Sequence, residues 1–262
     1  MGSATREALG AARSALAGLA GSGTLTTGEE LFAAGRVIGE SAQLRAALSD
    51  PSADPANKRG IVDAVFGSLS QTTRDLLGVV ASSRWSNDEE LLAGIEELGL
   101  RVLATSSDAP IEAELFTFGR AVSSNAELEL AVGSKLGTNE AKDTLVKALL
   151  TSGASAQTVA IVQHLVLQPR GRRIAELLRH AAAIVADEAG LAIATVSTAT
   201  PLGAAQLERL RAGLAKTYGR DLRINQVIDP TLIGGVRVQI GDDVIDGSIA
   251  SRLNELRLQL AG

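Results

Sequence analysis

The chain contains no cysteine. The absence of thiols excludes disulfides, thiolate metal sites and cysteine nucleophiles, and it is compatible with a reducing compartment. Aromatic residues are also scarce, at 2% of the 262 residues. Hydrophobic cores must therefore be built mostly from Ala, Leu, Val and Ile, of which Ala and Leu are strong helix formers. The composition predicts a mainly helical protein.

Long apolar runs and an excess of positive charge are missing as well. Residues 181–196 are interrupted by Asp187, Glu188 and Gly190, so they fall short of the roughly 20 apolar residues that span a bilayer. Residues 1–20 lack the continuous apolar core of a secretory signal, and no export is expected. The net charge of -5 argues against nucleic acid and anionic lipid as partners. Any membrane association is expected to be indirect, without insertion.

Hydrophobic residues make up 45% of the chain, enough for one large domain or two to three small ones. Apolar residues spaced by three and four predict a series of helices. The first helix carries Leu9, Ala12, Leu16 and Leu19 and is capped by Ser3 or Thr5. Further helices are expected over 28–48, 56–66, 72–82 and 172–188. Another begins at Asn87, with Glu90 at the capping-box position.

The helical region repeats itself at a distance of 84 residues. Leu31-Phe32 falls on Leu115-Phe116 and Lys58 on Lys142, and ten of the 36 positions from 31 to 66 match without a gap. Chance at these residue frequencies would give roughly three or four matches. The pattern predicts an internal duplication of a helical domain.

After residue 190 the period changes from helical to alternating. Strands are expected over 191–198, at Leu222 to Ile224 and in a hairpin of 236–240 with 244–245, and a helix over 206–218. Asp246 or Ser248 can cap a final helix, which carries Ile249, Leu253, Leu256 and Leu260. The predicted fold class is mainly α. Two tandem helical-bundle copies, residues 1–108 and 109–190, precede a small α/β domain, residues 191–262, with a short mixed sheet and a C-terminal helix.

Several residues have both a chemical and a structural interpretation. Four aspartates, Asp229, Asp242, Asp243 and Asp246, could converge on a divalent cation, but turn and cap roles are favoured because Asp accepts local amide hydrogen bonds. Gly234-Gly235 lacks the flanking pattern of a phosphate or dinucleotide loop and favours a bend. His164 and His180 lack further ligands at useful spacing, which favours packing or surface roles. We therefore expect no catalytic residue, no cofactor and no metal.

Two further features leave alternatives open. The run Arg170-Gly171-Arg172-Arg173 either forms a solvated loop at a helix entry or grips a phosphate or a partner carboxylate. Trp85 follows a helix, and a single tryptophan either seals a bundle or anchors an interface. The sealing role is favoured.

The C-terminal sequence carries a family resemblance. The run IDPTLIGGVRVQIGDDVIDGSIASRLNEL, residues 228–256, resembles the C-terminal segment of the delta subunit of bacterial rotary ATP synthases, the family of the mitochondrial oligomycin-sensitivity-conferring protein. Residues 195–202, TVSTATPL, resemble the strand-to-helix passage before it in that family. The chain exceeds one helical domain plus one α/β domain by roughly one repeat, so it resembles a long form with a duplicated helical domain, of the kind found in actinobacteria.

The resemblance implies a non-catalytic stator subunit at the cytoplasmic face of the cell membrane, held there through the ATP synthase. Its partners would be the N-terminal helices of the alpha subunits of the catalytic head and the b subunit of the peripheral stalk, with one copy per complex. Candidate head contacts are Leu9, Ala12 and Leu16, or Leu115 and Phe116. Candidate stalk contacts are Leu253, Leu256 and Leu260.

Two alternatives belong to other classes of protein. A general helical adaptor outside any ATP synthase would share the bundles but would not need the sequence of residues 228–256. An enzyme that uses the acidic loops and a metal would need Asp243, yet no catalytic arrangement supports it.

Overall fold

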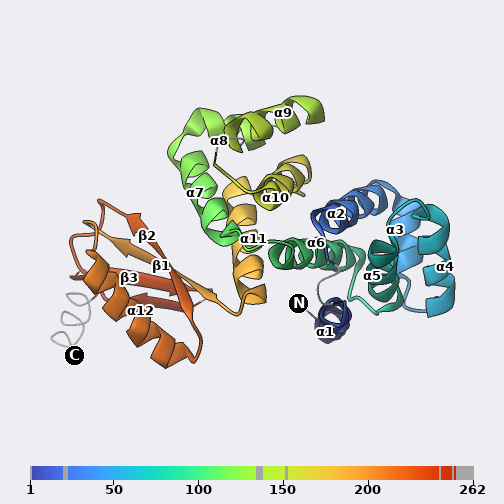
Figure 1. The fold of residues 1–262 in the computed structure, drawn as a ribbon, viewed down its shortest axis with the longest axis horizontal. Coiled ribbons are helices and arrows are strands. Elements are labelled where there is room, and N and C mark those ends of the chain that lie inside the picture. Colours follow the sequence, from blue (N-terminus) through green and yellow to red (C-terminus); the bar gives the residue numbers. More distant parts are fainter. Residues whose placement is uncertain are drawn as a thin grey trace, which may run out of the picture. The chain divides into compact units, whose positions relative to one another are not determined.

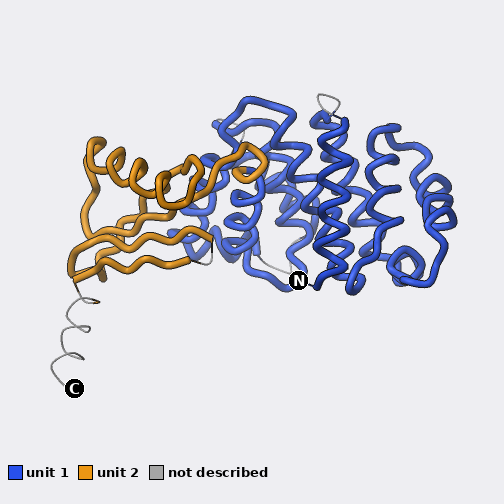
Figure 2. Tube along the Cα trace, turned by 90° about the horizontal axis from the view of Figure 1, so that it is seen from below, with its two compact units in different colours: residues 1–185 blue, residues 186–262 orange. Residues whose placement is uncertain are grey.

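The computed structural model describes residues 2–19, 23–133, 138–150, 153–241, 243–249 and 251. The chain divides into two compact units, residues 1–185 and 186–262 (Figure 2). The first unit is entirely helical, and the second contains a mixed sheet (Figure 1). The predicted fold class is confirmed for the described residues.

Six helices form the first half of the helical unit. They are α1 (Ser3–Gly18), α2 (Leu25–Glu40), α3 (Ala42–Ser49), α4 (Pro55–Val65), α5 (Gln71–Ser82) and α6 (Asp88–Thr105). Polar side chains cap five of them by accepting a backbone amide hydrogen bond, which satisfies one of the amides that a helix start leaves unpaired. The caps are Thr24, Ser41, Asp54, Ser70 and Asn87.

Two sequence predictions in this half are wrong in detail. The helix expected over 28–48 is two helices, because Ser41 takes an extended conformation, with φ -104° and ψ 105°, and its hydroxyl caps α3. Neither Ser3 nor Thr5 caps α1, whose N-cap is Gly2. Thr5 lies inside the helix and donates its hydroxyl hydrogen to the Glu90 carboxylate on α6.

Five more helices follow in the same order. They are α7 (Ile111–Ser124), α8 (Ala126–Gly133), α9 (Asn139–Leu150), α10 (Ala156–Leu167) and α11 (Ile174–Glu188). The starts of α3 and α8, at 42 and 126, are 84 residues apart, and those of α4 and α9, at 55 and 139, are again 84 apart. For α5 and α10, at 71 and 156, the distance is 85, and for α6 and α11, at 88 and 174, it is 86.

The two halves also share a polar contact. Glu30 on α2 accepts hydrogen bonds from the Ser70 amide and from the hydroxyls of Ser70 and Thr73. Glu114 on α7 accepts the same three bonds from Ser155 and Thr158. These bonds outweigh burial and lower the pKa of both carboxyls. The repeated contact is the structural counterpart of the sequence repeat.

The second unit is a four-stranded sheet with one helix. It contains β1 (Ala192–Thr198), α12 (Ala204–Tyr218), β2 (Leu222–Ile228), β3 (Val236–Ile240) and β4 (Asp243–Asp246), with strand order β2-β1-β3-β4. The β1 and β2 strands are parallel, and the other neighbours are antiparallel. The expected strands, helix and hairpin are confirmed. The core comprises Ala192, Ala194, Val196, Leu214, Leu222 and Val238.

Gly234-Gly235 forms the predicted bend before β3. Their φ values are 152° and 87°, and a Cβ on Gly235 would lie 2.5 Å from the Gly247 carbonyl oxygen. At the other end of the hairpin, Ser248 Oγ accepts a hydrogen bond from the Ser251 amide, as expected of a cap. The rest of the predicted final helix, including Leu253, Leu256 and Leu260, lies outside the described residues.

Candidate partner-binding surfaces

The loop aspartates accept local hydrogen bonds, as the favoured turn and cap interpretation predicted. Asp229 accepts hydrogen bonds from the Thr231 hydroxyl at 2.6 Å and amide at 2.9 Å, and Asp246 accepts one from the Ser248 amide at 2.9 Å. These bonds lower the pKa of both carboxyls. Among the described residues, no group of three potential ligands could hold a metal ion. Asp242 lies outside them.

The predicted head contacts lie mostly in the core. Leu9, Ala12 and Leu16 are 7%, 1% and 7% exposed, on the face of α1 that packs against α5 and α6. Leu115 is fully buried, while Phe116 is half-buried. A partner would reach the α1 residues only if α1 moved, and their role as contacts stays a prediction.

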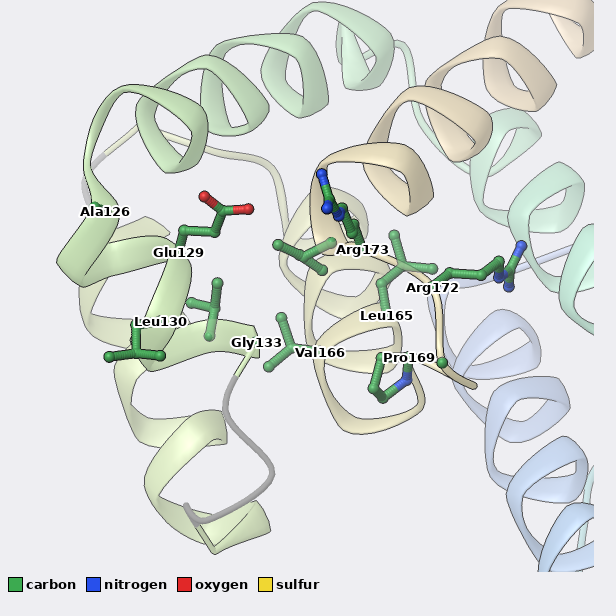
Figure 3. Close-up of a pocket in the computed structure, with 12 residues that line it drawn as sticks. Ala126, Glu129, Leu130, Gly133, Leu165, Val166, Pro169, Arg172 and Arg173 are labelled. Carbon is green, nitrogen blue, oxygen red and sulfur yellow. The ribbon is translucent and has the colours of Figure 1, made fainter.

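A cleft of about 380 Å³ opens in the second half of the helical unit, between α8, α10 and the segment that leads into α11 (Figure 3). Its walls include Val132, Leu165 and Val166. Leu130, on α8, is 72% exposed at the cleft. The cleft therefore combines an apolar lining with a large apolar side chain that the described chain leaves uncovered.

Charges of opposite sign flank this cleft. Glu129 comes from α8, and Arg173 lies across the cleft at the start of α11 (Figure 3). At the corresponding positions of the first half, the basic residue is on α3 and the acidic residues are at the start of α6. Arg45 lies 3.6 Å from the Asp88 carboxylate and 3.9 Å from that of Glu89. The ion pairs tie α3 to α6.

Two arginines of the run 170–173 bind a buried carboxylate of the same chain. Arg170 and Arg172 both donate to Glu96 on α6, Arg172 at 3.0 Å, and His164 Nε2 lies 3.2 Å from the same carboxylate. The Arg170 backbone has a φ of 45°. Arg170 and Arg172 pair with Glu96 within the chain, while residues 171–173 are exposed, as expected of a solvated loop at a helix entry. Sequence reasoning missed this cluster.

Trp85 is packed inside the first bundle, as the favoured sealing role predicted. It is 4% exposed and its Nε1 donates to the Val80 carbonyl oxygen at 2.8 Å. Gly94 makes room for the ring, because a Cβ there would lie 2.1 Å from it.

The second unit has apolar side chains on its surface around the hairpin. Ile233 is 76% exposed, and Ile249, whose amide donates to the neighbouring Gly234 carbonyl oxygen, is 46% exposed. Val244 and Ile245, on the edge strand β4, are 47% and 46% exposed. We call Ile233 and Ile249 the hairpin surface, because Val244 and Ile245 are consecutive in a strand and point to opposite faces of the sheet. Exposed apolar groups of this kind mark binding sites.

No helix in the described residues is long and apolar enough to cross a membrane. Paired helical bundles with a small α/β domain and uncovered apolar surfaces are typical of a subunit that binds other proteins.

Comparison with known proteins identifies the assembly. The family model "ATP synthase delta (OSCP) subunit" matches residues 13–96 and 100–260. The ATP synthase subunit delta of Leifsonia xyli is 59% identical over 100% of both chains, and that of Streptomyces coelicolor is 38% identical over 100% of this chain and 98% of its own. The chain belongs to the ATP synthase delta (OSCP) family.

A chain from the Toxoplasma gondii mitochondrial ATP synthase hexamer has a TM-score of 0.43 at 17% identity, covering 63% of this chain and 95% of its own. Family membership makes this chain a non-catalytic, structural subunit of the ATP synthase. It also removes the two alternatives of a general adaptor and a metal-dependent enzyme.

Proposed function

We propose that this subunit links the catalytic head to the peripheral stalk, so that torque from the proton-driven rotor drives ATP synthesis. The rotor turns inside the head, and a head free to turn with it would dissipate the torque. A tether must therefore hold the head at one end and the stalk at the other. Two uncovered apolar surfaces in separate units of the chain support this arrangement.

The hairpin surface is the proposed stalk contact, and it is the observation that carries the proposal. Ile233, at 76% exposure, is a large apolar group that water solvates poorly. Burial of such a side chain contributes about 1.5–3 kcal/mol. Ile249, which contacts the adjacent Gly234, extends the apolar area. An amphipathic helix of the stalk b subunit would bury these residues by helix-in-groove recognition.

The cleft of Figure 3 is the proposed head contact. An N-terminal helix of an alpha subunit would insert apolar side chains between Leu130 and Val166, with its own charges facing Glu129 and Arg173. In this arrangement the second helical copy binds the head, and the first copy lengthens or stiffens the stator. A tether of this kind should bind on the order of nanomolar, or about 12 kcal/mol.

Calorimetry with the full chain tests both contacts. The probes are a synthetic peptide of the alpha-subunit N-terminus and a soluble C-terminal fragment of the b subunit. We expect Leu130→Asp to weaken peptide binding at least tenfold and leave the b fragment bound, and Ile233→Asp to do the reverse. Ala46→Asp, at the first-copy position that corresponds to Leu130, is the matched control. Binding of neither probe by the wild-type chain would refute the linking role.

A further inference from the structure

We infer that α6 is shared between the two helical copies: it is the last helix of the first copy and takes the place of the first helix of the second, with Glu96 fixing the junction. The first copy has six helices, α1 to α6, and the residues that the structure describes between α6 and the sheet form five more. A counterpart of α1 in the second copy should lie directly before α7, the counterpart of α2, and α6 occupies that position. The inference concerns the chain itself and does not depend on which partner binds where.

Chain spacing supports the shared role. The segment between α1 and α2 is residues 19–24, and the segment between α6 and α7 is residues 106–110. The α1 helix begins at 3 and α6 at 88, a distance of 85 residues, which equals the distance between α5 and α10. No residues are left over for another helix. In the sequence, α6 precedes α7 by a short connection, as α1 precedes α2.

The burial of α6 agrees with two sets of neighbours. Every residue from Leu98 to Leu103 is buried, including the charged Arg101. A helix buried on all sides lies inside a structure rather than at its edge. One side packs closely on α2, because a Cβ at Gly99 would lie 2.6 Å from the Phe32 ring. The α6 helix also contacts α10 of the second copy.

The junction with α10 is built from specific groups. The His164 ring of α10 stacks on Phe32 of α2, with ring centroids 4.0 Å apart and an interplanar angle of 7°. Nε2 of the same ring faces Glu96 at 3.2 Å. Further along, Gln157 on α10 donates to the Ser106 hydroxyl, just after α6, at 3.3 Å. The α2–α6 pair thus holds α10 at both ends.

Glu96 is the centre of this junction. It is 4% exposed and accepts hydrogen bonds from three second-copy side chains, those of His164, Arg170 and Arg172. Burial lowers the pKa of His164, so at neutral pH the ring is uncharged. Because a carboxylate only accepts, Nε2 carries the proton, and Nδ1 has no hydrogen-bond partner in the described part of the chain. The arginines supply the opposing charge.

Removing the buried carboxylate from such an ion pair lowers the stability of the fold, because the remaining charges lose their partner. The two copies therefore cannot hinge freely at α6. They form one arm whose internal angle is fixed, which is the property that a part under torque requires.

Distance measurements between spin labels test the fixed angle directly. Since the chain has no cysteine, Ala11→Cys on α1 and Ala148→Cys on α9 place one label on each copy without background, and both positions are exposed. We expect a narrow distance distribution that Glu96→Ala widens at least twofold. Glu97→Ala is the matched control, because Glu97 forms ion pairs with Arg13 and Arg101 of the first copy, and it should leave the width unchanged.

Equal widths in the two variants, or a broad distribution in the wild type, would overturn the inference. If Glu96→Ala does not fold, Glu96→Gln provides the same comparison. Native-state hydrogen exchange tests the sharing of α6 separately. The slowest amides of α5 and of α10 should open with equal free energy across a denaturant series, and unequal values would mean that the copies unfold independently.

Discussion

Glu96→Gln should remove part of the acid sensitivity of the helical unit. Burial alone would raise the pKa of Glu96, but the hydrogen bond from His164 and the charges of Arg170 and Arg172 lower it from 4.5 to about 2. A difference of roughly 2.5 units at about 1.4 kcal/mol per unit corresponds to about 3 kcal/mol of stability at neutral pH.

The sign follows from proton linkage. The folded state binds the Glu96 proton less readily than the unfolded state, so the contribution is complete above about pH 4.5 and is lost as the pH falls toward 2. About 2 kcal/mol of it should disappear between pH 7 and pH 3. A glutamine does not titrate. The difference in unfolding free energy between wild type and variant should therefore shrink by this amount over that range.

Urea unfolding of the full chain measures this difference. Trp85 is the only tryptophan and is buried in the first copy, so its fluorescence reports the helical unit. Glu97→Gln changes the neighbouring carboxylate, whose side chain is 12% exposed, and serves as the control. If Glu96→Gln and wild type lose stability in parallel from pH 7 to pH 3, the ionised Glu96 does not hold the junction and the reasoning fails.

Four other substitutions test separate contacts. Gly235→Ala should destabilise the second unit by at least about 1–3 kcal/mol, because of its positive φ and the Gly247 carbonyl oxygen at 2.5 Å from the new Cβ; a drop in the melting temperature of that unit by calorimetry would show it. Gly213→Ala, in open space on α12, should be neutral or stabilising in the same assay. Glu114→Ala should lower the free energy of unfolding by about 1–3 kcal/mol, because it leaves the Ser155 amide unpaired. Glu30→Ala should cause the same loss, and urea unfolding followed by circular dichroism measures both.

Periodicity was sufficient to predict most elements. The alternation of Val236, Val238 and Ile240 and the spacing of Leu207, Leu210 and Leu214 depend only on which face a side chain takes, and both elements are present. The break at Ser41 was missed because the apolar spacing continues across it. A single extended residue turns the helix without disturbing that spacing.

The junction could not be predicted from local patterns. Its members His164 and Glu96 are 68 residues apart, and no local pattern around the arginines indicates a carboxylate so distant in sequence. One signal was available: residues 91–103 are apolar on nearly every side, which is typical of a fully buried helix. Candidate head contacts such as Leu9 and Leu115 were chosen for being apolar, and the same property places them in the core.

The most direct test of the linking role is the coupling of ATP hydrolysis to proton pumping in liposomes that contain ATP synthase assembled without this subunit. The account predicts that hydrolysis continues while pumping is lost, and that the wild-type chain restores pumping but Ile233→Asp does not. Full pumping in the absence of the subunit would contradict it.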